Sequence, residues 1–380
     1  MKIAIYYPWL HLKSGAERTI LETVKRSKHK YTIFTNHYDR NGTYPEFKNL
    51  KVVQLKKVPV RRNIFSVAKA AFIIASQKIY LKGFSLFLVH SEGIGDLILI
   101  RNNKIPTICF CHTPLRPVFD EQYKNIARSK RSFFSKIIYK ILDIFFRIAD
   151  RYLWKKYKYI FFNSKESLRR AKNGGLINKK TEFGVLHPGV DWENVKPTWW
   201  YEKYFLVPGR IMWTKNIELA IKSFLLFEKH KNDRGFKLVI AGQVDNKSTE
   251  YFDKLKSLIG KGKNITFIKN PSDSRMVNLY ASCYAVLATS FNEDWGITPI
   301  EANAYGKPVL AVDSGGFKES QINGKTGFLL ANNPKIFSSK MLLLAGKTNT
   351  TRRMGRYARL NSEKYSWRNF ITKLDKFQLP

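Results

Sequence analysis

Residues 288–330 read ATSFNEDWGITPIEANAYGKPVLAVDSGGFKESQINGKTGFLL, and this stretch decides the predicted fold. Its apolar start is typical of a strand, and Glu293 follows in a loop rich in Asn, Asp and Gly. Glu301, separated from Glu293 by seven residues, falls in the first turn of a predicted helix. Thr298 suits the N-cap of that helix and Pro299 its first position. Both carboxylates are therefore expected at the carboxyl end of a parallel strand, where open α/β sheets bind ligands.

Two interpretations of these carboxylates are open. A pair of carboxylates first suggests acid/base catalysis. The backbone N–H groups at the start of the helix, those of Gly296, Ile297 and Thr298 among them, also offer a site for phosphate or sugar oxygens. Alternatively, Thr298 and Glu301 form a capping box, which explains Glu301 by helix stability alone. Glu293 has no such explanation and is the stronger functional candidate.

The same stretch resembles the signature segment of retaining GT-B glycosyltransferases of family 4, the group 1 glycosyltransferases. That family has two glutamates separated by seven residues, a Gly-x-Pro-Val segment, a Gly-Gly turn with a nearby Glu, and a Gly-Phe-Leu strand. The matching residues here are Glu293 and Glu301, residues 306–309, residues 315–316 with Glu319, and residues 327–329. The resemblance implies an α/β, GT-B fold of two Rossmann-like domains with parallel sheets facing across a cleft. It also implies that Glu293 holds sugar hydroxyls and that Glu301 accepts hydrogen bonds from a ribose.

The rest of the chain fits this architecture. A chain of 380 residues is expected to form two domains. Strand-like runs alternate with helical patterns, one of them over residues 63–82, as in βαβ units with a parallel sheet. The resemblance divides the chain into an N-terminal acceptor-binding domain (1–195), a C-terminal nucleotide-sugar-binding domain (196–362) and a final helix (363–380). That helix is expected to cross back to the first domain, with Trp367 as its packing anchor.

A first candidate phosphate site is the corner after the opening strand. Ser14 and Glu17 predict a capping box, and Gly15 lies at the tight turn between strand and helix. A strand, a glycine corner and a helix form a phosphate-binding geometry, although a single Gly is weak evidence. The family has a Gly-Ala-Glu-Arg corner here, and the resemblance implies that Gly15 and Ala16 approach the donor pyrophosphate.

A second candidate is the corner around Gly209, Arg210 and Lys215. The forked guanidinium and the compact ammonium can converge on one diphosphate, although two loop cations are often only surface residues. The family has the same two cations here, and the resemblance implies that both neutralise the phosphates of the leaving nucleotide. Asn216 stands where the family commonly has Gly, and Asn also tolerates unusual backbone angles. Gly242, at the end of another strand, joins the predicted donor site.

His112 is the candidate in the N-terminal half. A lone His at a strand end is usually structural or merely exposed. Its surroundings, CHTPLR over residues 111–116 followed by Asp120, resemble the acceptor-domain loop of family 4 mannosyltransferases that act on polysaccharide or lipid-linked acceptors. The resemblance implies that His112 approaches the transferred sugar and that Arg116 and Asp120 serve the acceptor.

The predicted chemistry needs no metal and no cofactor. Breaking a sugar–phosphate bond leaves negative charge on a diphosphate, which Arg210, Lys215 and helix N-termini can stabilise as a fixed electrostatic arrangement. The sequence contains no Asp-x-Asp motif. The family retains the anomeric configuration, and no carboxylate is an obvious nucleophile. A front-face mechanism is implied, in which the departing phosphate takes the proton of the acceptor hydroxyl.

The charge of the chain is unusual. There are 67 Lys and Arg against 29 Asp and Glu, a net charge of +38, which predicts an anionic partner unless it is a general surface bias. Residues 124–158 carry eleven Lys or Arg and two acidic residues. Apolar residues recur there at helical spacing, namely Phe134, Ile137, Ile138, Ile141, Phe145, Ile148 and Tyr152. Such a helix lies in an anionic membrane interface or packs its apolar stripe on the domain core.

The predicted function is transfer of a hexose from a nucleotide-diphosphate sugar to a glycan or lipid-linked acceptor. GDP-mannose is favoured, and UDP-hexoses stay open. The alternatives are a GT-B nucleotide-sugar epimerase, a phosphorylase, whose cofactor-binding Lys we do not find, and a nucleic-acid-binding protein. No RNA- or DNA-binding motif is present, so nucleic acid is not an expected partner.

The expected location is the cytoplasm, with peripheral attachment to the inner face of the membrane. No apolar run approaches the ~20 residues of a membrane span, and the N-terminus is interpreted as a first buried strand and not as a signal peptide. Three cysteines are too few for a disulfide scaffold or a zinc site.

Overall fold

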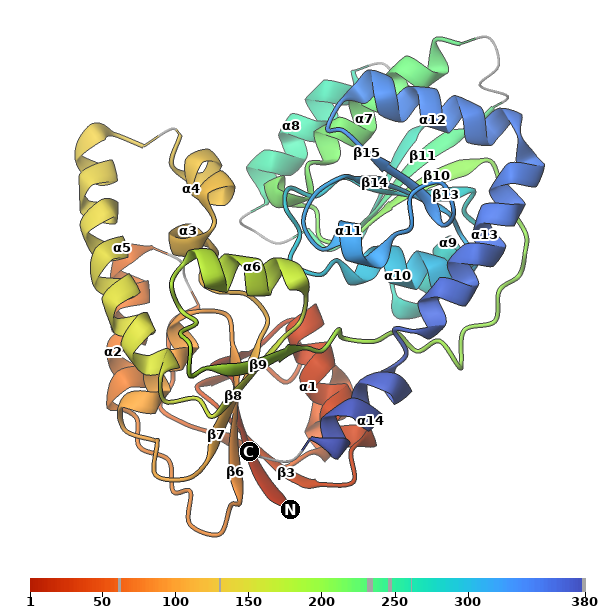
Figure 1. The fold of residues 1–380 in the computed structure, drawn as a ribbon. Helices are drawn as coiled ribbons and strands as arrows, with labels where there is room; N and C mark the ends of the chain where they lie inside the picture. Colours follow the sequence, from red (N-terminus) through yellow and green to blue (C-terminus); the bar gives the residue numbers. More distant parts are fainter. Residues whose placement is uncertain (61–62, 130, 231–234, 245–247, 261, 378–380) are drawn as a thin grey trace. The chain divides into compact units, whose positions relative to one another are not determined.

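Two α/β units make up the chain (Figure 1). A computed structural model describes residues 1–60, 63–129, 131–230, 235–244, 248–260 and 262–377. The N-terminal unit comprises Met1–Pro188 together with Arg368–Pro380, and the C-terminal unit comprises Gly189–Trp367. The chain therefore leaves the N-terminal unit once and returns to it at its end.

The N-terminal unit is built on a parallel sheet. Among its described residues, seven strands lie in the order β5-β3-β1-β6-β7-β8-β9. Their bounds are β1 Lys2–Tyr6, β3 Lys30–Thr35, β5 Val52–Gln54, β6 Leu86–Ser91, β7 Thr107–Cys111, β8 Tyr159–Phe162 and β9 Glu182–Val185. Strand β1 pairs with β3 on one side and with β6 on the other, so the strand order reverses there. Ligands of such sheets bind beyond the carboxyl ends of the strands near the reversal.

Helices cover this sheet and complete its core. They are α1 Gly15–Arg26, η1 Pro45–Asn49, α2 Ile64–Ser76, η2 Ile94–Ile100, α3 Arg116–Phe119, α4 Glu121–Arg128, α5 Phe133–Trp154, α6 Lys165–Asn173 and α14 Trp367–Lys376, beside a short pair of strands, β2 Trp9–Leu10 and β4 His37–Tyr38. Helix α14 begins at the buried Trp367, the last residue of the C-terminal unit, and packs on the N-terminal unit from Arg368 on: the Phe370 ring lies 5.7 Å from the Phe110 ring, and the Ser27 hydroxyl donates to Asp375.

Helix α2 is shorter than the pattern over residues 63–82 predicts. Asn63 caps its start by accepting from the backbone N–H of Ser66 (2.8 Å), and the helix ends at Ser76. The prediction is wrong beyond that point because Asn102 binds the extended backbone that follows. Its side chain donates to the Gln77 carbonyl and accepts from the Ile79 N–H, both at 2.7 Å.

The C-terminal unit repeats the same strand order. Within its described residues, six parallel strands lie in the order β12-β11-β10-β13-β14-β15. Their bounds are β10 Tyr204–Pro208, β11 Lys237–Gly242, β12 Ile265–Lys269, β13 Ala285–Ala288, β14 Val309–Val312 and β15 Gly327–Leu330. The helices are η3 Trp213–Lys215, α7 Ile217–Glu228, α8 Thr249–Ile259, α9 Asp273–Ser282, α10 Ile297–Ala304, α11 Phe317–Ser320, α12 Pro334–Gly346 and α13 Thr348–Glu363. Strands β10, β13 and β14 are buried throughout, as expected of a parallel sheet covered on both faces.

The basic segment 124–158 covers the last part of α4 and all of α5, and its residue 130 lies outside the described residues. Ser132 caps α5 and separates it from α4. The interpretation that the apolar stripe packs on the domain core is wrong for every residue of the predicted stripe, since all seven side chains are exposed, Phe134 by 77% and Phe145 by 68%. Asp143, Asp150, Leu153 and Trp154 are the buried residues of this helix.

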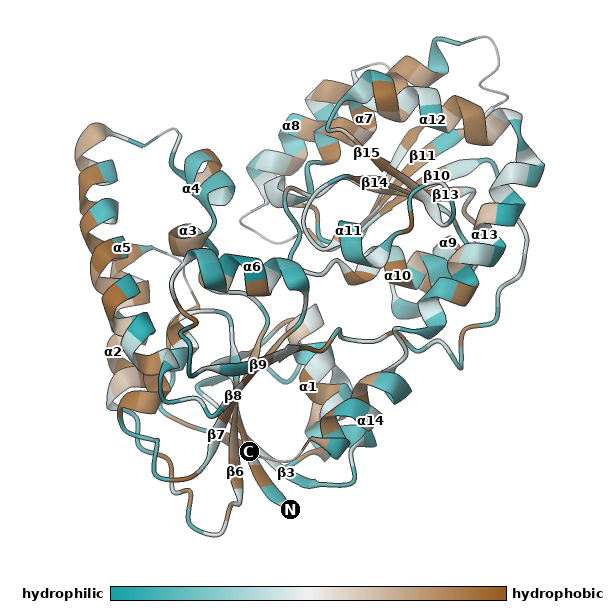
Figure 2. Ribbon diagram, viewed as in Figure 1, coloured by the Kyte–Doolittle hydropathy of each residue, from teal (hydrophilic) through white to brown (hydrophobic). Residues whose placement is uncertain are grey.

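The orientation of α5 follows from the partners of Asp143 and Trp154. Asp143 forms a two-pronged ion pair with Arg128 of α4 at 2.8 Å, and Trp154 donates to Asp96 of η2 at 3.3 Å. These contacts hold Asp143 and Trp154 on the buried side of α5, and the apolar stripe is left exposed. Figure 2 shows that hydrophobic residues recur along this helix. In the part of the chain that the structure describes, no helix is both long enough and apolar enough to cross a membrane.

Candidate active site

The candidate donor-binding corner of the C-terminal unit lies after β10, where Gly209 and Gly242 are in contact. Gly209 follows β10 with φ at +120°, a region that favours glycine, and its N–H donates to the Ala241 carbonyl at 3.0 Å. A Cβ added to Gly242, at the end of β11, would lie 1.7 Å from the Gly209 carbonyl oxygen. No residue with a side chain fits at position 242. This close contact between the backbones of Gly209 and Gly242 fixes where the chain leaves the sheet at Arg210.

Lys215 and Glu293, two of the predicted catalytic residues, form an ion pair in this unit. The Lys215 ammonium donates to the Glu293 carboxylate at 2.7 Å, and both side chains are partly exposed. Two further bonds hold their loops side by side: the Thr289 hydroxyl donates to the Lys215 carbonyl (2.8 Å), and the Phe291 N–H donates to the Thr214 carbonyl (2.9 Å). The structure thus brings together a cation and a carboxylate that lie 78 residues apart.

Asn216 directly follows Lys215. Its backbone is left-handed, with φ and ψ both 48°, and it occupies the N-cap position of helix α7. The prediction that Asn can take the place of a glycine here is confirmed, because Asn is among the few residues that adopt this conformation readily.

The Gly-Gly turn after β14 clamps the loop that carries Glu293. The Gly316 N–H donates to the Glu293 carbonyl at 2.8 Å, and Gly315 has φ at +57°. A Cβ on Gly315 would lie 2.3 Å from that same carbonyl oxygen. A Cβ on Gly296 would lie 2.4 Å from the Phe317 ring, so the loop is also closed from the side of α11. Glu293 therefore stands on a loop whose backbone is fixed.

The predicted capping box at the start of α10 is wrong. The helix begins at Ile297 and its N-cap is Gly296, which is left-handed (φ +70°, ψ +74°) and has no side chain to cap with. Glycine readily adopts this left-handed conformation at the N-cap, so the helix begins directly after Gly296 and Thr298 lies inside it. Thr298 and Pro299 become the second and third helical residues.

Glu301 is held by a tyrosine and not by a capping box. The Tyr280 hydroxyl, from helix α9, donates to the Glu301 carboxylate at 2.8 Å, and the Tyr280 ring stacks on that of Tyr305 with centroids 5.7 Å apart. Burial, together with the adjacent Glu301 charge, raises the pKa of Tyr280 well above its usual value, so the phenol stays a hydrogen-bond donor. No sequence pattern pointed to Tyr280, because it lies in a separate helix, α9, 21 residues before its partner.

His112 of the N-terminal unit lies directly after β7 and is buried. Its Nε2 is 3.0 Å from Nδ1 of His90, and the Tyr7 ring meets it edge-on with centroids 6.3 Å apart. Burial lowers the pKa of His112 to about 3, so the imidazole is neutral near pH 7. In this state it can donate or accept a hydrogen bond but supplies no positive charge.

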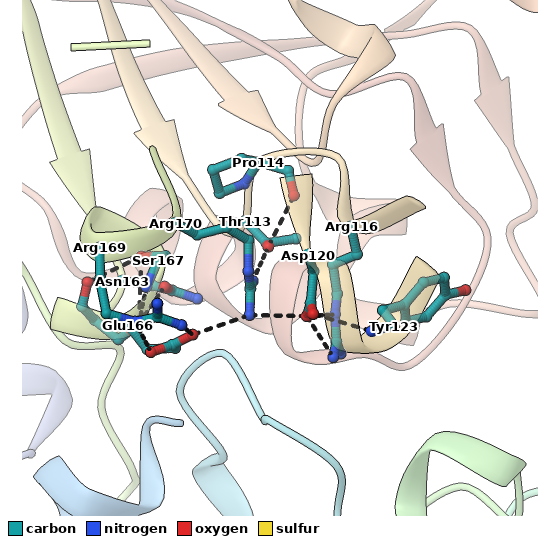
Figure 3. Close-up of polar contacts among 11 residues, drawn as sticks. Thr113, Pro114, Arg116, Asp120, Tyr123, Asn163, Glu166, Ser167, Arg169 and Arg170 are labelled. Atoms are coloured by element: carbon teal, nitrogen blue, oxygen red, sulfur yellow. Dashed lines mark hydrogen bonds and ion pairs between the residues drawn. The ribbon is translucent and has the colours of Figure 1, made fainter. Parts of the chain in front are cut away.

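Arg116 and Asp120 belong to an ion-pair network that closes the loop after His112 (Figure 3). Arg116 and Arg170 converge on one oxygen of Asp120, at 3.0 and 3.2 Å, and Asp120 also accepts from the Tyr123 N–H (3.0 Å) as the N-cap of α4. Burial acts to raise the pKa of Asp120, but Arg170, the Tyr123 N–H and Arg116 outweigh it and hold that pKa below its usual value.

Arg170 organises this network, and sequence reasoning missed it. The side chain is buried, donates to the Thr113 hydroxyl at 2.6 Å and pairs with Glu166 at 3.4 Å. Thr113 lies beside His112, so Arg170 connects the loop to helix α6. An acceptor role for Arg116 and Asp120 stays a prediction; what the structure shows is that both shape the loop.

The predicted phosphate-binding turn before α1 has free space next to Gly15. Helix α1 begins at Gly15 with Ser14 as its N-cap, but the Ser14 hydroxyl bonds to the Glu17 carboxylate and not to a backbone N–H. Glu17 also accepts from the Leu12 N–H at 3.3 Å, and burial raises the pKa of Glu17 to about 7. A Cβ added to Gly15 would meet no atom within 4 Å. The space above Gly15 is therefore not needed for packing.

Candidate metal ligands do not gather in the part of the chain that the structure describes. No three His, Cys, Asp or Glu side chains there are placed to hold a metal ion, and all three cysteines are buried and free. Arg210, after β10, and Lys215, at the end of η3, are the two cations predicted to bind the donor phosphates.

Comparisons with known proteins find a family model, relatives and solved structures that are similar to this chain. Residues 195–361 match the family model described as glycosyl transferases group 1. The human alpha-1,3/1,6-mannosyltransferase ALG2 is 25% identical over 96% of this chain and 92% of its own length. Two solved structures share the fold: Anabaena Alr3699/HepE in complex with UDP and glucose (TM-score 0.73, 16% identity, 98% of both chains) and the sucrose-phosphate synthase of Thermosynechococcus elongatus (TM-score 0.76, 14% identity, 98% of this chain and 97% of that one). These structural neighbours are GT-B glycosyltransferases.

Proposed function

We propose that this chain is a group 1 glycosyltransferase, as its match to that family model supports, and that it transfers mannose from GDP-mannose to a glycan or lipid-linked acceptor with retention of configuration. The choice of mannose is supported by the ALG2 mannosyltransferases, which align with 96% of this chain in the human case. A UDP-hexose is the competing donor, because the HepE structure contains UDP and glucose.

The observation that carries the proposal is the Lys215–Glu293 ion pair, whose lysine side chain lies beside Gly209 at the carboxyl end of β10. In the proposed reaction the bond between the anomeric carbon and the β-phosphate oxygen breaks, and the acceptor oxygen bonds to that carbon on the same face. The departing phosphate takes the acceptor proton. Arg210 and Lys215 stabilise the charge that grows on the diphosphate, which is the term that most often dominates enzymatic catalysis.

The other site residues are proposed to hold the donor. Glu293 binds sugar hydroxyls, and Glu301, oriented by Tyr280, accepts hydrogen bonds from the ribose. Backbone groups of the two corners and of the α10 start contact the phosphates, at Gly15, Ala16, Gly209, Gly242, Gly296, Ile297 and Thr298. His112 contacts the transferred sugar as a neutral imidazole, and Arg116 and Asp120 position the acceptor side of the loop. We propose that no metal takes part.

The test replaces the phosphate-binding cations and assays transfer with each nucleotide sugar. Arg210→Ala and Lys215→Ala should each lower kcat by ~10²-fold or more, as the loss of one preorganised partner of the transition-state charge does. Lys254→Ala is the matched control, since Lys254 forms a comparable ion pair with Glu218 (3.1 Å) on the exposed surface of the same unit. Full activity of a folded Arg210 or Lys215 variant, or turnover without an acceptor to an epimerised nucleotide sugar, would contradict the proposal.

We also propose that helix α5 attaches the enzyme to an anionic membrane surface, on the cytoplasmic side. Its exposed apolar stripe is accompanied by exposed basic residues, Lys136, Lys140 and Arg151 among them. This combination is typical of helices that lie in the interface of an anionic bilayer. A lipid-linked acceptor would be presented at the same surface.

A further inference from the structure

His90 and His112 form a buried pair whose function the proposed mechanism does not yet explain. His90 is the penultimate residue of β6, and its Nδ1 lies 3.0 Å from Nε2 of His112. Both rings lie close to the Phe110 ring, with centroid distances of 5.3 and 5.1 Å. Burial lowers the pKa of both imidazoles, so each ring is neutral and carries one N–H.

The position of the shared hydrogen has two solutions. If His112 donates from Nε2, His90 must carry its own hydrogen on Nε2. That atom is buried and has no hydrogen-bond partner among the described residues. If His90 donates from Nδ1, its buried Nε2 is a bare lone pair. A buried N–H without an acceptor is the rarer and more costly arrangement, so the second solution is favoured.

We propose that His90 is a positioning residue that donates from Nδ1 to His112 and thereby fixes His112 in its Nδ1–H tautomer. His112 then presents an N–H donor, not a lone pair, on the side of the ring away from His90. A hydroxyl or ring oxygen of a sugar can accept from that N–H. The inference rests on the proposed role of His112 at the transferred sugar and adds the direction of its hydrogen bond. The partner of a functional imidazole commonly selects its tautomer in this way.

The first measurement is made on the unmodified protein. The chain has seven histidines, and ¹⁵N-histidine labelling resolves the protonated and unprotonated ring nitrogens of each. The His112 signals are assigned as those that disappear in His112→Gln. We expect a neutral His112 with its hydrogen on Nδ1 at pH 7. A His112 with its hydrogen on Nε2 overturns the proposal, whatever the activity of the enzyme.

Two variants of His90 then separate its tautomer effect from its packing. His90→Phe keeps a ring against Phe110 and removes the donor, whereas His90→Asn places an amide N–H near the position of Nδ1. We expect His90→Phe to shift His112 toward the Nε2–H tautomer and to lower kcat about 10- to 100-fold with little change in the donor KM, as loss of an orienting partner does. His90→Asn should retain the Nδ1–H tautomer and recover most of kcat.

The outcomes distinguish this inference from the proposed function. An unchanged Nδ1–H tautomer in a folded His90→Phe protein contradicts the positioning role. If the tautomer behaves as expected but His112→Gln keeps full transferase activity, the tautomer assignment stands and the proposed sugar contact of His112 fails. Should His90→Phe not fold, the spectrum of the unmodified protein and the His90→Asn comparison still decide.

Discussion

Two glycines assigned to the donor site lie in opposite surroundings. Gly242 is enclosed, because a Cβ there would collide with the Gly209 carbonyl at 1.7 Å. Gly15 is open, because a Cβ there would meet nothing within 4 Å, and its φ is not positive. Packing therefore explains why Gly242 is a glycine, whereas at Gly15 neither packing nor backbone conformation requires one. A ligand that approaches the backbone would supply the missing reason.

Gly15→Ala should separate these two explanations. Because Gly15 is the first residue of α1, the added methyl should leave the melting temperature unchanged or slightly raised. It should raise the KM of the nucleotide sugar by roughly 10-fold or more if the phosphates approach this backbone, since a single misplaced methyl group in a binding site has an effect of that order. Steady-state kinetics with a varied donor measure this.

Gly346→Ala provides the control for Gly15→Ala. Gly346 ends helix α12, and a Cβ added there would likewise meet no atom within 4 Å, but this glycine belongs to no predicted site. The donor KM of this variant should equal that of the unmodified enzyme. An unchanged KM in Gly15→Ala as well would remove Gly15 from the donor site.

At the scale of single elements, local sequence patterns predicted correctly whether a segment is a strand or a helix. They predicted less well where a helix begins and which of its sides is buried. Apolar runs and glycine corners identified the strands, and the nature of Asn predicted the left-handed residue 216. The start of α10 was missed because Thr298 and Gly296 are both acceptable caps in sequence, and only the fit of Gly296 against Phe317 decides between them. Periodicity likewise revealed the apolar stripe of α5 but not that Arg128 and Asp96 turn it outward.

The outward face of α5 leads to a prediction for membrane binding. Phe134→Ser combined with Phe145→Ser should weaken sedimentation with vesicles containing anionic lipid by roughly 10-fold or more, since each buried Phe side chain contributes about 1.5–3 kcal/mol. Both side chains are among the most exposed apolar groups of the helix, so the fold should be unaffected.

Exposed apolar residues of the other unit supply the control for this experiment. Tyr357→Ser with Leu360→Ser removes two exposed side chains of α13, 50% and 63% accessible, and should leave vesicle binding unchanged. Equal binding to neutral and anionic vesicles by the unmodified protein would contradict the membrane proposal.

At the scale of the whole molecule, the parallel sheets and their order were predictable, whereas the contacts that complete the candidate site were not. Alternating strands and helices require right-handed crossovers and so favour the doubly wound order seen in both units. His90 contacts His112, which lies 22 residues away, and Tyr280 contacts Glu301, which lies 21 residues away. Arg170 contacts Thr113, which lies 57 residues away. Such pairs arise only after the sheets form, so no local pattern predicts them.

The N-terminal unit also buries acid groups in a chain with an excess of bases. Burial raises the pKa of Glu17 to about 7 and that of Asp96 to about 6. Between the ordinary glutamate value of 4.5 and about 7, the folded protein keeps a proton on Glu17 that the unfolded chain releases. The stability of this unit should therefore be highest below pH 4.5 with respect to Glu17 and should fall as the pH rises to about 7.

Glu17→Gln should flatten this pH dependence. The neutral amide loses no stability over that range, so the variant should gain a few degrees in melting temperature relative to the unmodified protein as the pH is raised from about 5 to about 8. Thermal unfolding at the two pH values measures the difference. Glu182→Gln, at an exposed position of the same unit, should show no such gain. An equal gain in both variants would mean that Glu17 is not the cause.

The outward stripe of α5 also determines how a purified sample should behave. In a buffer without lipid or detergent, the aromatic and aliphatic groups of two molecules can shield one another, and salt that screens the +38 charge lets the molecules approach. Self-association that grows with ionic strength and disappears in mild non-ionic detergent is then the expected behaviour. Gel filtration under those two conditions would separate self-association through this stripe from a genuine assembly.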